Sequence, residues 1–274
     1  MAESDQVGIS NGAYQMALST FRSIVVVGVL PVLLTVSDAG AGSGRGKPPR
    51  FVTVAPGIAH ATFQVHPEDA ESFSGHAFNV DLDEADLRLI PAGGPSSRRT
   101  VAEIAAPYPA AVAINASFFD NEGRAMGLAV DEERVMARGK RRSWGALVID
   151  DRNARIVLGA EIKDDHVHRL VVQGIPRLVV GGQIQPLKPQ LAERTAVCAK
   201  RNVVVLVVST KTETTSFARF LADPPDRGGL GCRDALNLDG GPSTQLVVKL
   251  PSLTLSLPGA WGVPNALVVA PGKR

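Results

Sequence analysis

From residue 51 to its end, the chain alternates short apolar runs with turns of two or three residues. In four places two such runs flank one tight turn, which is typical of β-hairpins. The predicted turns are Asp83–Ala85, Asp151–Asn153, Gly181–Gly182 and Lys200–Asn202. The run Val203–Val208 is apolar throughout, so we expect a strand buried on both faces. This pattern constrains the fold most, because it requires a core built largely from strands.

Short helices are predicted between the strands. Thr100 and Glu103 have the spacing of a capping box, and the helix that they begin has to end before Pro107. Ser216 can cap a second helix, FARFLA, which has to end before Pro224. With two or three short helices and a large sheet of mixed strand direction, we expect an α+β fold. Residues 51–274 contain no second linker, so they are expected to form one domain.

The N-terminal region is expected to lie outside this domain. Arg22 precedes the apolar run Ile24–Val36, and an Ala-x-Ala pattern follows at Ala39–Ala41. The run is shorter than the roughly 20 apolar residues of a transmembrane helix, and it fits a secretory signal peptide. Residues 1–41 are therefore expected to be a signal peptide or, alternatively, an N-terminal anchor that contacts the membrane. Residues 42–50 would be a flexible leader, and the folded domain would be periplasmic or secreted.

Composition and charge exclude some partners. Hydrophobic residues make up 45% of the 274 residues, which is enough for a sizeable core. The net charge is +2, with acidic and basic residues interspersed. A nucleic-acid-binding protein would concentrate basic residues on one face, so no nucleic-acid partner is expected.

The cysteines and histidines do not predict a metal site. Cys198 and Cys232 lack metal-ligand spacing. An exported protein permits a disulfide between them, and two buried thiols are the alternative. We expect the two to lie close together, because each adjoins a strand that carries candidate site residues. His166 and His168 form an H-x-H pattern without a companion motif, so we expect a surface loop there and predict no metal or cofactor.

Three polar segments interrupt apolar strands and carry the candidate site. The first, AVAINASFFD (Ala111–Asp120), places Asn115 at the end of a strand. Its amide can both donate to and accept from a sugar hydroxyl or a phosphate oxygen. Phe118 or Phe119 could stack on a sugar face. The alternative is that the phenylalanines belong to the core and Asn115 closes a turn.

The second segment, ERTAVCAK, has Arg194 at the start of an apolar strand. A guanidinium there suits a phosphate or a carboxylate, because its fork makes two parallel charge-assisted bonds. The alternative is a surface arginine paired with Glu193 or Asp234.

The third segment, LNLDGGPSTQLVV, places Asp239 at the end of a strand. Gly240 and Gly241 allow a positive φ and the close approach of a ligand, and successive amides in such a turn can bind an anion. Ser243 and Thr244 add hydroxyl donors. A plain hairpin turn is the alternative, but it would need only Asp-Gly, so the added Ser-Thr favours a functional site.

Together and in this order, the segments resemble the phosphodiester glycosidase family, which includes bacterial exopolysaccharide-associated proteins and the catalytic domain of the mannose-6-phosphate uncovering enzyme. The matching motifs span most of the chain beyond residue 55. Two departures stand out: Ala116-Ser117 replaces a Gly-Gly pair, and Pro242 replaces a third glycine. The motifs are NASFFD (Asn115–Asp120), GIPRLVVGG (Gly174–Gly182), RTAVC (Arg194–Cys198), NLDGGPST (Asn237–Thr244) and VPNALVV (Val263–Val269).

The resemblance implies hydrolysis of a bond between a sugar and a phosphodiester in envelope polysaccharide or its precursors. Asp239 would activate water or stabilise the cationic sugar, and Asn115 would orient the substrate. Arg194, the Gly240 and Gly241 amides, Ser243 and Thr244 would bind the phosphodiester. Asp120 could supply a second carboxylate, or Asp239 could hold a cation. The alternative function is a non-catalytic protein that binds polysaccharide or assists exopolysaccharide assembly.

Overall fold

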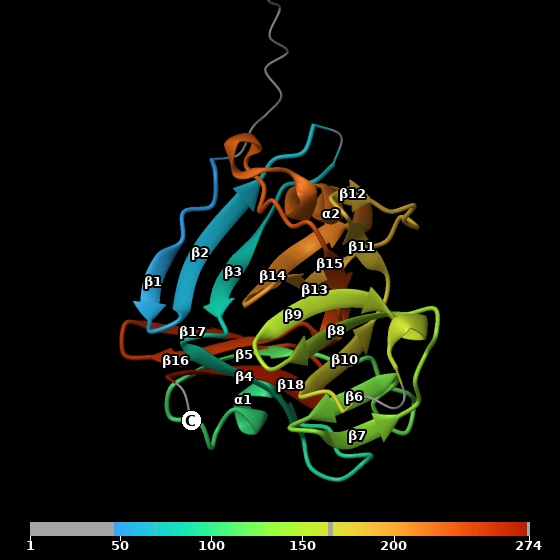
Figure 1. The fold of residues 1–274 in the computed structure, drawn as a ribbon. Coiled ribbons are helices and arrows are strands. Elements are labelled where there is room, and N and C mark those ends of the chain that lie inside the picture. Colours follow the sequence, from blue (N-terminus) through green and yellow to red (C-terminus); the bar gives the residue numbers. More distant parts are fainter. Residues whose placement is uncertain (1–46, 69, 164–166, 273–274) are drawn as a thin grey trace, which may run out of the picture. The chain divides into compact units, whose positions relative to one another are not determined.

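The computed structural model describes residues 47–68, 70–163 and 167–272 of the chain. Within these residues the fold consists of three antiparallel β-sheets and two short α-helices (Figure 1). The predicted signal peptide or anchor, and most of the predicted leader, lie outside the described residues. In the part of the chain that is described, no helix has the length and apolar character needed to cross a membrane.

The expected α+β fold is wrong, because strands dominate and every pairing between named strands is antiparallel. The predicted hairpin around Asp83–Ala85 explains part of the error. The strand before this turn, β3, pairs with β2 and β14, whereas the strand after it, β4, pairs with β18 in another sheet. The turn therefore carries the chain from one sheet to the next. The other three predicted hairpins are confirmed as β8–β9, β11–β12 and β13–β14.

The first sheet has eight strands in the order β1-β2-β3-β14-β13-β15-β11-β12. Its strands are Val52–Ala55 (β1), Ile58–Val65 (β2), Phe73–Asp81 (β3), Arg177–Val180 (β11), Gln183–Ile184 (β12), Leu191–Lys200 (β13), Val203–Glu213 (β14) and Ala235–Asn237 (β15).

The second and third sheets have five strands each, in the orders β7-β6-β10-β8-β9 and β17-β16-β5-β18-β4. The second consists of Leu128–Asp131 (β6), Arg134–Arg138 (β7), Gly145–Asp150 (β8), Asn153–Leu158 (β9) and Leu170–Gly174 (β10). The third consists of Ala85–Pro91 (β4), Ala111–Asn115 (β5), Leu246–Leu250 (β16), Leu253–Leu257 (β17) and Asn265–Pro271 (β18).

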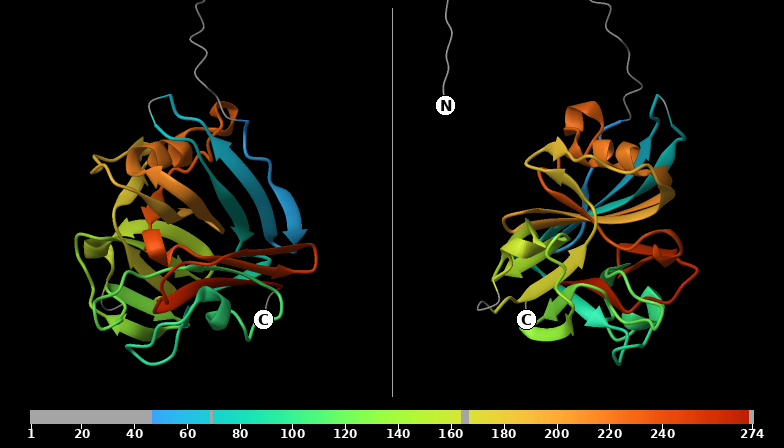
Figure 2. Two further views of the ribbon diagram at one scale, coloured as in Figure 1. Left: turned by 180° about the vertical axis from the view of Figure 1, so that it is seen from behind. Right: turned by 90° about the vertical axis from the view of Figure 1, so that its right-hand side faces the viewer.

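One hydrophobic core lies between the three sheets. Leu206 of the first sheet, Leu147 of the second and Ile114 of the third all belong to it, and each is fully buried. Because side chains alternate between the two faces of a strand, the next residues pack on the outer faces of the sheets. Helix α2 (Thr214–Ala222) covers the outer face of the first sheet, and α1 (Val101–Ile104) covers that of the third (Figure 2).

The two helices confirm one predicted cap and correct the other. The capping box of α1 is present, with Thr100 Oγ1 accepting from the Glu103 N–H and the Glu103 carboxylate accepting from the Thr100 N–H. Helix α2 is capped by Glu213, not by Ser216, and ends before Pro224 as predicted. Strand β14 leads directly into this helix. Ser216 therefore lies inside its first turn, where its N–H donates a hydrogen bond to the Glu213 carboxylate.

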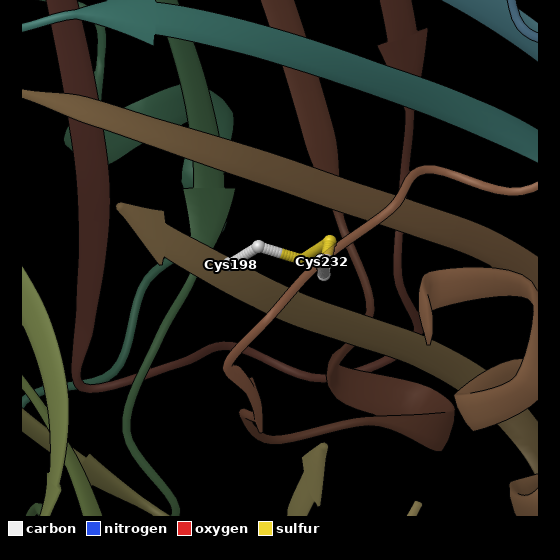
Figure 3. The surroundings of a disulfide bond; sticks show 2 residues. All are labelled: Cys198 and Cys232. Carbon is white, nitrogen blue, oxygen red and sulfur yellow. A yellow bond between two sulfur atoms is a disulfide. The ribbon is translucent and has the colours of Figure 1, made fainter. Parts of the chain in front are cut away.

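The two cysteines form a disulfide, which is one of the two alternatives that the sequence left open. Cys198 of β13 and Cys232 have Cα atoms 5.8 Å apart (Figure 3). The Cys232 N–H also donates to the carbonyl oxygen of Leu221 in α2. The bond thus fastens the segment between α2 and β15 to the centre of the first sheet, directly before the strand that leads to Asp239. Short 3-10 helices at Gly159–Glu161 (η1), Pro225–Arg227 (η2) and Gly241–Ser243 (η3) complete the described elements.

Candidate functional site

The candidate site lies at one end of the third sheet, where several strands begin or end together. Asn115, the last residue of β5, pairs with Ala266 near the start of β18, and Asn265 pairs with Pro91 at the end of β4. On the other side of β5, Leu246 at the start of β16 lies between Ile114 and Leu257. The loops that leave these strands therefore gather at one edge, although they are far apart in the sequence (Figure 1).

These loops border an open cavity of about 800 Å³. The loop after β4 contributes a serine and an arginine, the loop after β5 two phenylalanines and an aspartate, and the loop between β17 and β18 a tryptophan. Asp239 comes from the segment between β15 and β16. The lining residues are Ser96, Arg98, Phe118, Phe119, Asp120, Asn121, Asp239, Ala260, Trp261 and Gly262.

Asp239 is the carboxyl group with the most altered acidity in this cavity. Burial raises its pKa from 3.8 to about 6, because a desolvated carboxylate is less stable than the neutral acid. Hydrogen bonds from the Ser243 hydroxyl and from the Gly240 N–H oppose this rise. A carboxyl group with a pKa close to neutrality can accept a proton from water and release it again.

Asn115 anchors Asp239 through the backbone. Its Nδ2 donates to the carbonyl oxygen of Asp239 at 2.6 Å, and its Oδ1 accepts from Thr195 Oγ1 at 2.8 Å and from the Gln245 N–H at 3.1 Å. Asn115 is fully buried, and the Asp239 N–H donates to the carbonyl oxygen of Ala116. The amide is thus occupied by protein groups, and it joins the end of β5 to β13 and to the segments after β15 and before β16. Whether Asn115 also orients a substrate stays a prediction.

A second buried network, which the sequence did not indicate as functional, supports the loops. Gln245 Oε1 accepts from the first N–H of α1, at Val101, and Gln245 Nε2 donates to the carbonyl oxygen of Trp261. Asn265 bonds both the N–H and the hydroxyl of Ser117 at 3.0 Å. Buried polar groups of this kind are satisfied only when the loops adopt one arrangement. In the sequence, the only sign of this network is that Gln245 and Asn265 each stand beside an apolar run.

The turn after Asp239 is largely satisfied by its own hydrogen bonds. Gly240 N–H binds the Asp239 carboxylate, and the N–H groups of Ser243 and Thr244 bind carbonyl oxygens within the turn. Only Gly241 has a positive φ, of 57°. The carbonyl oxygen of Pro242 accepts from the N–H groups of Ala260 and Trp261. These bonds shape the wall of the cavity, and the predicted phosphate contacts of this turn stay a prediction.

Arg194 is not among the residues that line the cavity, although its backbone lies beside Gly240. The polar contacts of its guanidinium in the described structure are with the Gln190 carbonyl oxygen, Gln190 Oε1 and Thr214 Oγ1, at the start of α2. Its side chain is buried, and burial lowers its pKa, whereas nearby Glu213 opposes that change. The structure therefore brings Asn115 and Asp239 together but directs the guanidinium of Arg194 toward α2. The surface pairing with Glu193 or Asp234 does not form.

Two cavity residues escaped sequence-based prediction. Arg98 contacts the face of Phe119, with its guanidinium carbon 5.4 Å from the ring centre, and Phe119 packs edge to face against Trp261. Trp261 is 55% exposed, which is unusual for so large an apolar side chain. Arg98 and Trp261 lie in loops without strand or helix periodicity, so the sequence offered only their residue types.

Asp120 lines the same cavity but has a different environment. Its carboxylate accepts from the Arg124 N–H, from Arg124 Nε at 2.8 Å and from the Glu122 N–H. The hydrogen bonds from Arg124 and the positive charge of Arg124 hold the pKa of Asp120 below its usual value. Asp120 therefore stays ionised where Asp239 has a raised pKa.

Among residues 47–68, 70–163 and 167–272, no group of three His, Cys, Asp or Glu side chains has a metal-binding arrangement. The expected surface loop around His166 and His168 is wrong for His168. This side chain is buried, with Nδ1 at 2.8 Å from Asp150 Oδ1. His166 lies outside the described residues.

Comparison with known proteins agrees with the sequence motifs. Residues 108–270 match the phosphodiester glycosidase family. The fold is similar to that of the zebrafish N-acetylglucosamine-1-phosphodiester alpha-N-acetylglucosaminidase catalytic domain, auto-inhibited by its pro-peptide, with a TM-score of 0.62 and 19% identity over 84% of this chain and 88% of that chain. It is also similar to a hypothetical protein from Synechocystis, with a TM-score of 0.60 and 18% identity over 78% of this chain and 62% of that chain. No curated protein sequence matches the chain.

The family match covers more than half of the chain and includes the segments that supply Asn115, Asp120 and Asp239. The chain belongs to the phosphodiester glycosidase family.

Proposed function

We propose that this protein is an exported hydrolase that cleaves the bond between the anomeric carbon of a sugar and a phosphodiester oxygen, in envelope polysaccharide or its precursors. The observation that carries the proposal is the cavity at the end of the third sheet. It combines Asp239, whose pKa is raised to about 6, with an arginine, an exposed tryptophan and two partly buried phenylalanines. Family membership supplies the reaction class.

In the proposed reaction the bond from the anomeric carbon to the bridging oxygen breaks, and its electron pair leaves with the phosphate. The product is a phosphate monoester, which needs little acid assistance to leave. The sugar passes through an oxocarbenium-like state, to which a carboxylate gives electrostatic stabilisation. Water adds to the anomeric carbon and gives its proton to Asp239. Asp120, ionised beside Arg124, adds negative charge to the same cavity.

The cavity suggests which side chains contact the substrate. Arg98 offers a guanidinium for the phosphodiester, a role that the sequence suggested for Arg194. Trp261 and Phe119 offer apolar faces against which a sugar ring can pack. Asn115, Ser243 and Gly240 would act by holding Asp239 in place, because their described hydrogen bonds go to protein groups.

Export is supported by the disulfide between Cys198 and Cys232. Disulfides persist in oxidising compartments and are rare in the cytosol. The signal-like segment at residues 1–41 is consistent with a periplasmic or secreted protein, and mass spectrometry of protein from an exporting host would reveal whether it is cleaved.

The experiment that tests the function is an assay of purified protein against a panel of sugar-1-phosphodiesters, with detection of free sugar. The panel should include an N-acetylglucosamine-1-phosphodiester, because the zebrafish protein of similar fold is named for that substrate. We expect release of sugar from at least one compound by the parent protein, and release at least about 100-fold slower by the Asp239→Asn variant. Tight binding of a compound without any release would instead favour the non-catalytic polysaccharide-binding alternative.

A further inference from the structure

A second cavity, of about 960 Å³, adjoins the candidate site. Asp120 lines both cavities, so the two share one wall. The second cavity lies along the β6–β7 hairpin and the loops after β4 and β5. Its wall is unusually rich in arginine, with Arg88, Arg124, Arg134, Arg138 and Arg141.

Each of the three acidic side chains that line this cavity pairs with an arginine of the same wall. Asp131 accepts from Arg88 Nη2 at 2.6 Å, from Arg88 Nε at 3.1 Å and from the Leu89 N–H at 2.9 Å. Glu132 lies 3.4 Å from Arg88 Nε. Asp120 pairs with Arg124, whose second nitrogen also pairs with Glu122. Arg88 and Arg124 therefore account for the ion pairs of all three acidic side chains in the wall.

The other three arginines have no carboxylate partner among the described residues. Arg134 and Arg138 are exposed at the two ends of β7, the edge strand of the second sheet, and Arg141 is exposed in the loop that follows. Within the described part of the chain, none of the three forms an ion pair. The lining thus carries five positive and three negative side chains, and a concave wall with an excess of one sign attracts ions of the opposite sign.

The rest of the wall is suited to a carbohydrate chain. Tyr108, Met126, Val135 and Met136 line the cavity between the charged groups. Apolar and aromatic surfaces pack against the carbon faces of sugars, and guanidinium groups bind phosphate by paired hydrogen bonds. A small neutral sugar in the first cavity would use none of these contacts.

We propose that the second cavity binds the next phosphodiester along a sugar–phosphate polymer, so that the protein acts on repeating anionic chains rather than on isolated sugar phosphates. This inference rests on the proposed function, because that function makes the bound polymer a substrate. Its test does not depend on the proposed function. Binding of a phosphodiester polymer can be measured without any cleavage.

The test is titration calorimetry of the full folded protein with a short poly(glycerol phosphate), which presents repeating phosphodiesters whatever sugar the enzyme prefers. We expect saturable binding by the parent protein. Affinity should fall about tenfold or more in an Arg134→Ala/Arg138→Ala/Arg141→Ala variant, because charge-assisted bonds to phosphate are lost. A matched Arg219→Ala/Arg227→Ala/Arg233→Ala variant removes three exposed charges elsewhere on the protein and should bind like the parent. Thermal unfolding checks that each variant folds, and a variant with only Arg138→Ala provides a milder change.

Three results would overturn the inference: no binding by the parent, equal affinity in parent and triple variant, or equal affinity for single-stranded DNA with the same number of phosphates. The last result would indicate a non-selective polyanion surface. If the parent binds the polymer through these arginines but no sugar-1-phosphodiester is cleaved, the proposed function fails and the polymer site stands.

Discussion

Two Gly-Gly turns in this molecule have the same local chemistry and different surroundings. At Gly181-Gly182 the Gly181 N–H binds the carboxylate of Asp234 at 3.0 Å, and at Gly240-Gly241 the Gly240 N–H binds the carboxylate of Asp239 at the same distance. The first turn joins β11 to β12, is exposed, and has open space around both glycines.

The second turn is packed on one side: Gly240 lies against β13, whereas Gly241 has open space beside it and Pro242 is exposed. A Cβ on Gly240 would lie 2.8 Å from the carbonyl oxygen of Glu193, and a buried amide, Asn115, holds the Asp239 carbonyl oxygen. Burial raises the pKa of the Asp239 carboxyl group to about 6. The comparison teaches that a Gly-Gly turn with a bound aspartate becomes a candidate site through burial of the carboxyl group in a cavity wall, not through its own hydrogen bonds.

The largest difference between the two turns should appear in catalysis. Asp239→Asn keeps the shape of the side chain but removes its charge, so turnover of a cleaved sugar-1-phosphodiester should fall by a factor of 100 or more, about 3 kcal/mol in the barrier. The matched Asp234→Asn change beside the other turn should leave turnover within about twofold. Steady-state kinetics on the same substrate measure both. Full activity of Asp239→Asn would move the search for the carboxylate to Asp120.

The amides near the two turns should differ almost as much in stability. Asn115→Ala removes a fully buried side chain with three hydrogen bonds and leaves their partners unsatisfied, so it should destabilise the fold by about 3 kcal/mol. Gln185→Ala, near the exposed turn, removes one bond to Gln183 and should cost less than about 0.5 kcal/mol. Urea unfolding of the two variants measures the difference, and similar midpoints would contradict the role given to Asn115.

Adding a methyl group to each turn tests the packing itself. Gly240→Ala forces a Cβ against backbone and should cost about 2 kcal/mol. Gly182→Ala has space but a φ of 85°, so it should cost about 1 kcal/mol through backbone strain alone. The comparison is contradicted if thermal unfolding finds Gly182→Ala the more damaging change.

The smallest expected effect is a stability gain in the inactive variant. The folded pKa of Asp239, about 6, lies above its usual 3.8, so the folded protein binds this proton more tightly than the unfolded chain does. This contribution to stability is fully present below pH 3.8 and is lost as the pH rises through 6. Asp239→Asn avoids the loss, and because the group is partly exposed we expect a gain on the order of 1 kcal/mol at pH 7. Unfolding at pH 7 and at pH 3.5 measures it, and an equal gain at both would exclude the titration of Asp239 as its cause.

Part of the fold could be predicted from the sequence. Local signals predicted three hairpins, the Thr100 cap and the helix stop before Pro224, because each depends on neighbours in the chain. The fold class was wrong because an antiparallel three-sheet arrangement depends on pairings across long sequence distances, such as β5 with β18.

The candidate site divides in the same way. Asn115 and Asp239 could be proposed because each interrupts an apolar strand, and they do lie together. Arg194 also stands in an apolar strand, but the direction of its side chain depends on β13, which has an irregular register between Ala192 and Arg194. Arg98 and Trp261 enter the cavity from loops whose paths no local pattern determines.

The central claim is that this cavity cleaves the sugar side of a sugar phosphodiester. The most direct measurement uses a sugar phosphodiester that the protein cleaves. The reaction is run in water that carries a heavy oxygen isotope, and the phosphate product is analysed by mass spectrometry. Attack at the anomeric carbon predicts a phosphate monoester without the heavy isotope, because the bridging oxygen leaves with phosphorus. A heavy oxygen in the phosphate product would mean attack at phosphorus and would contradict the account.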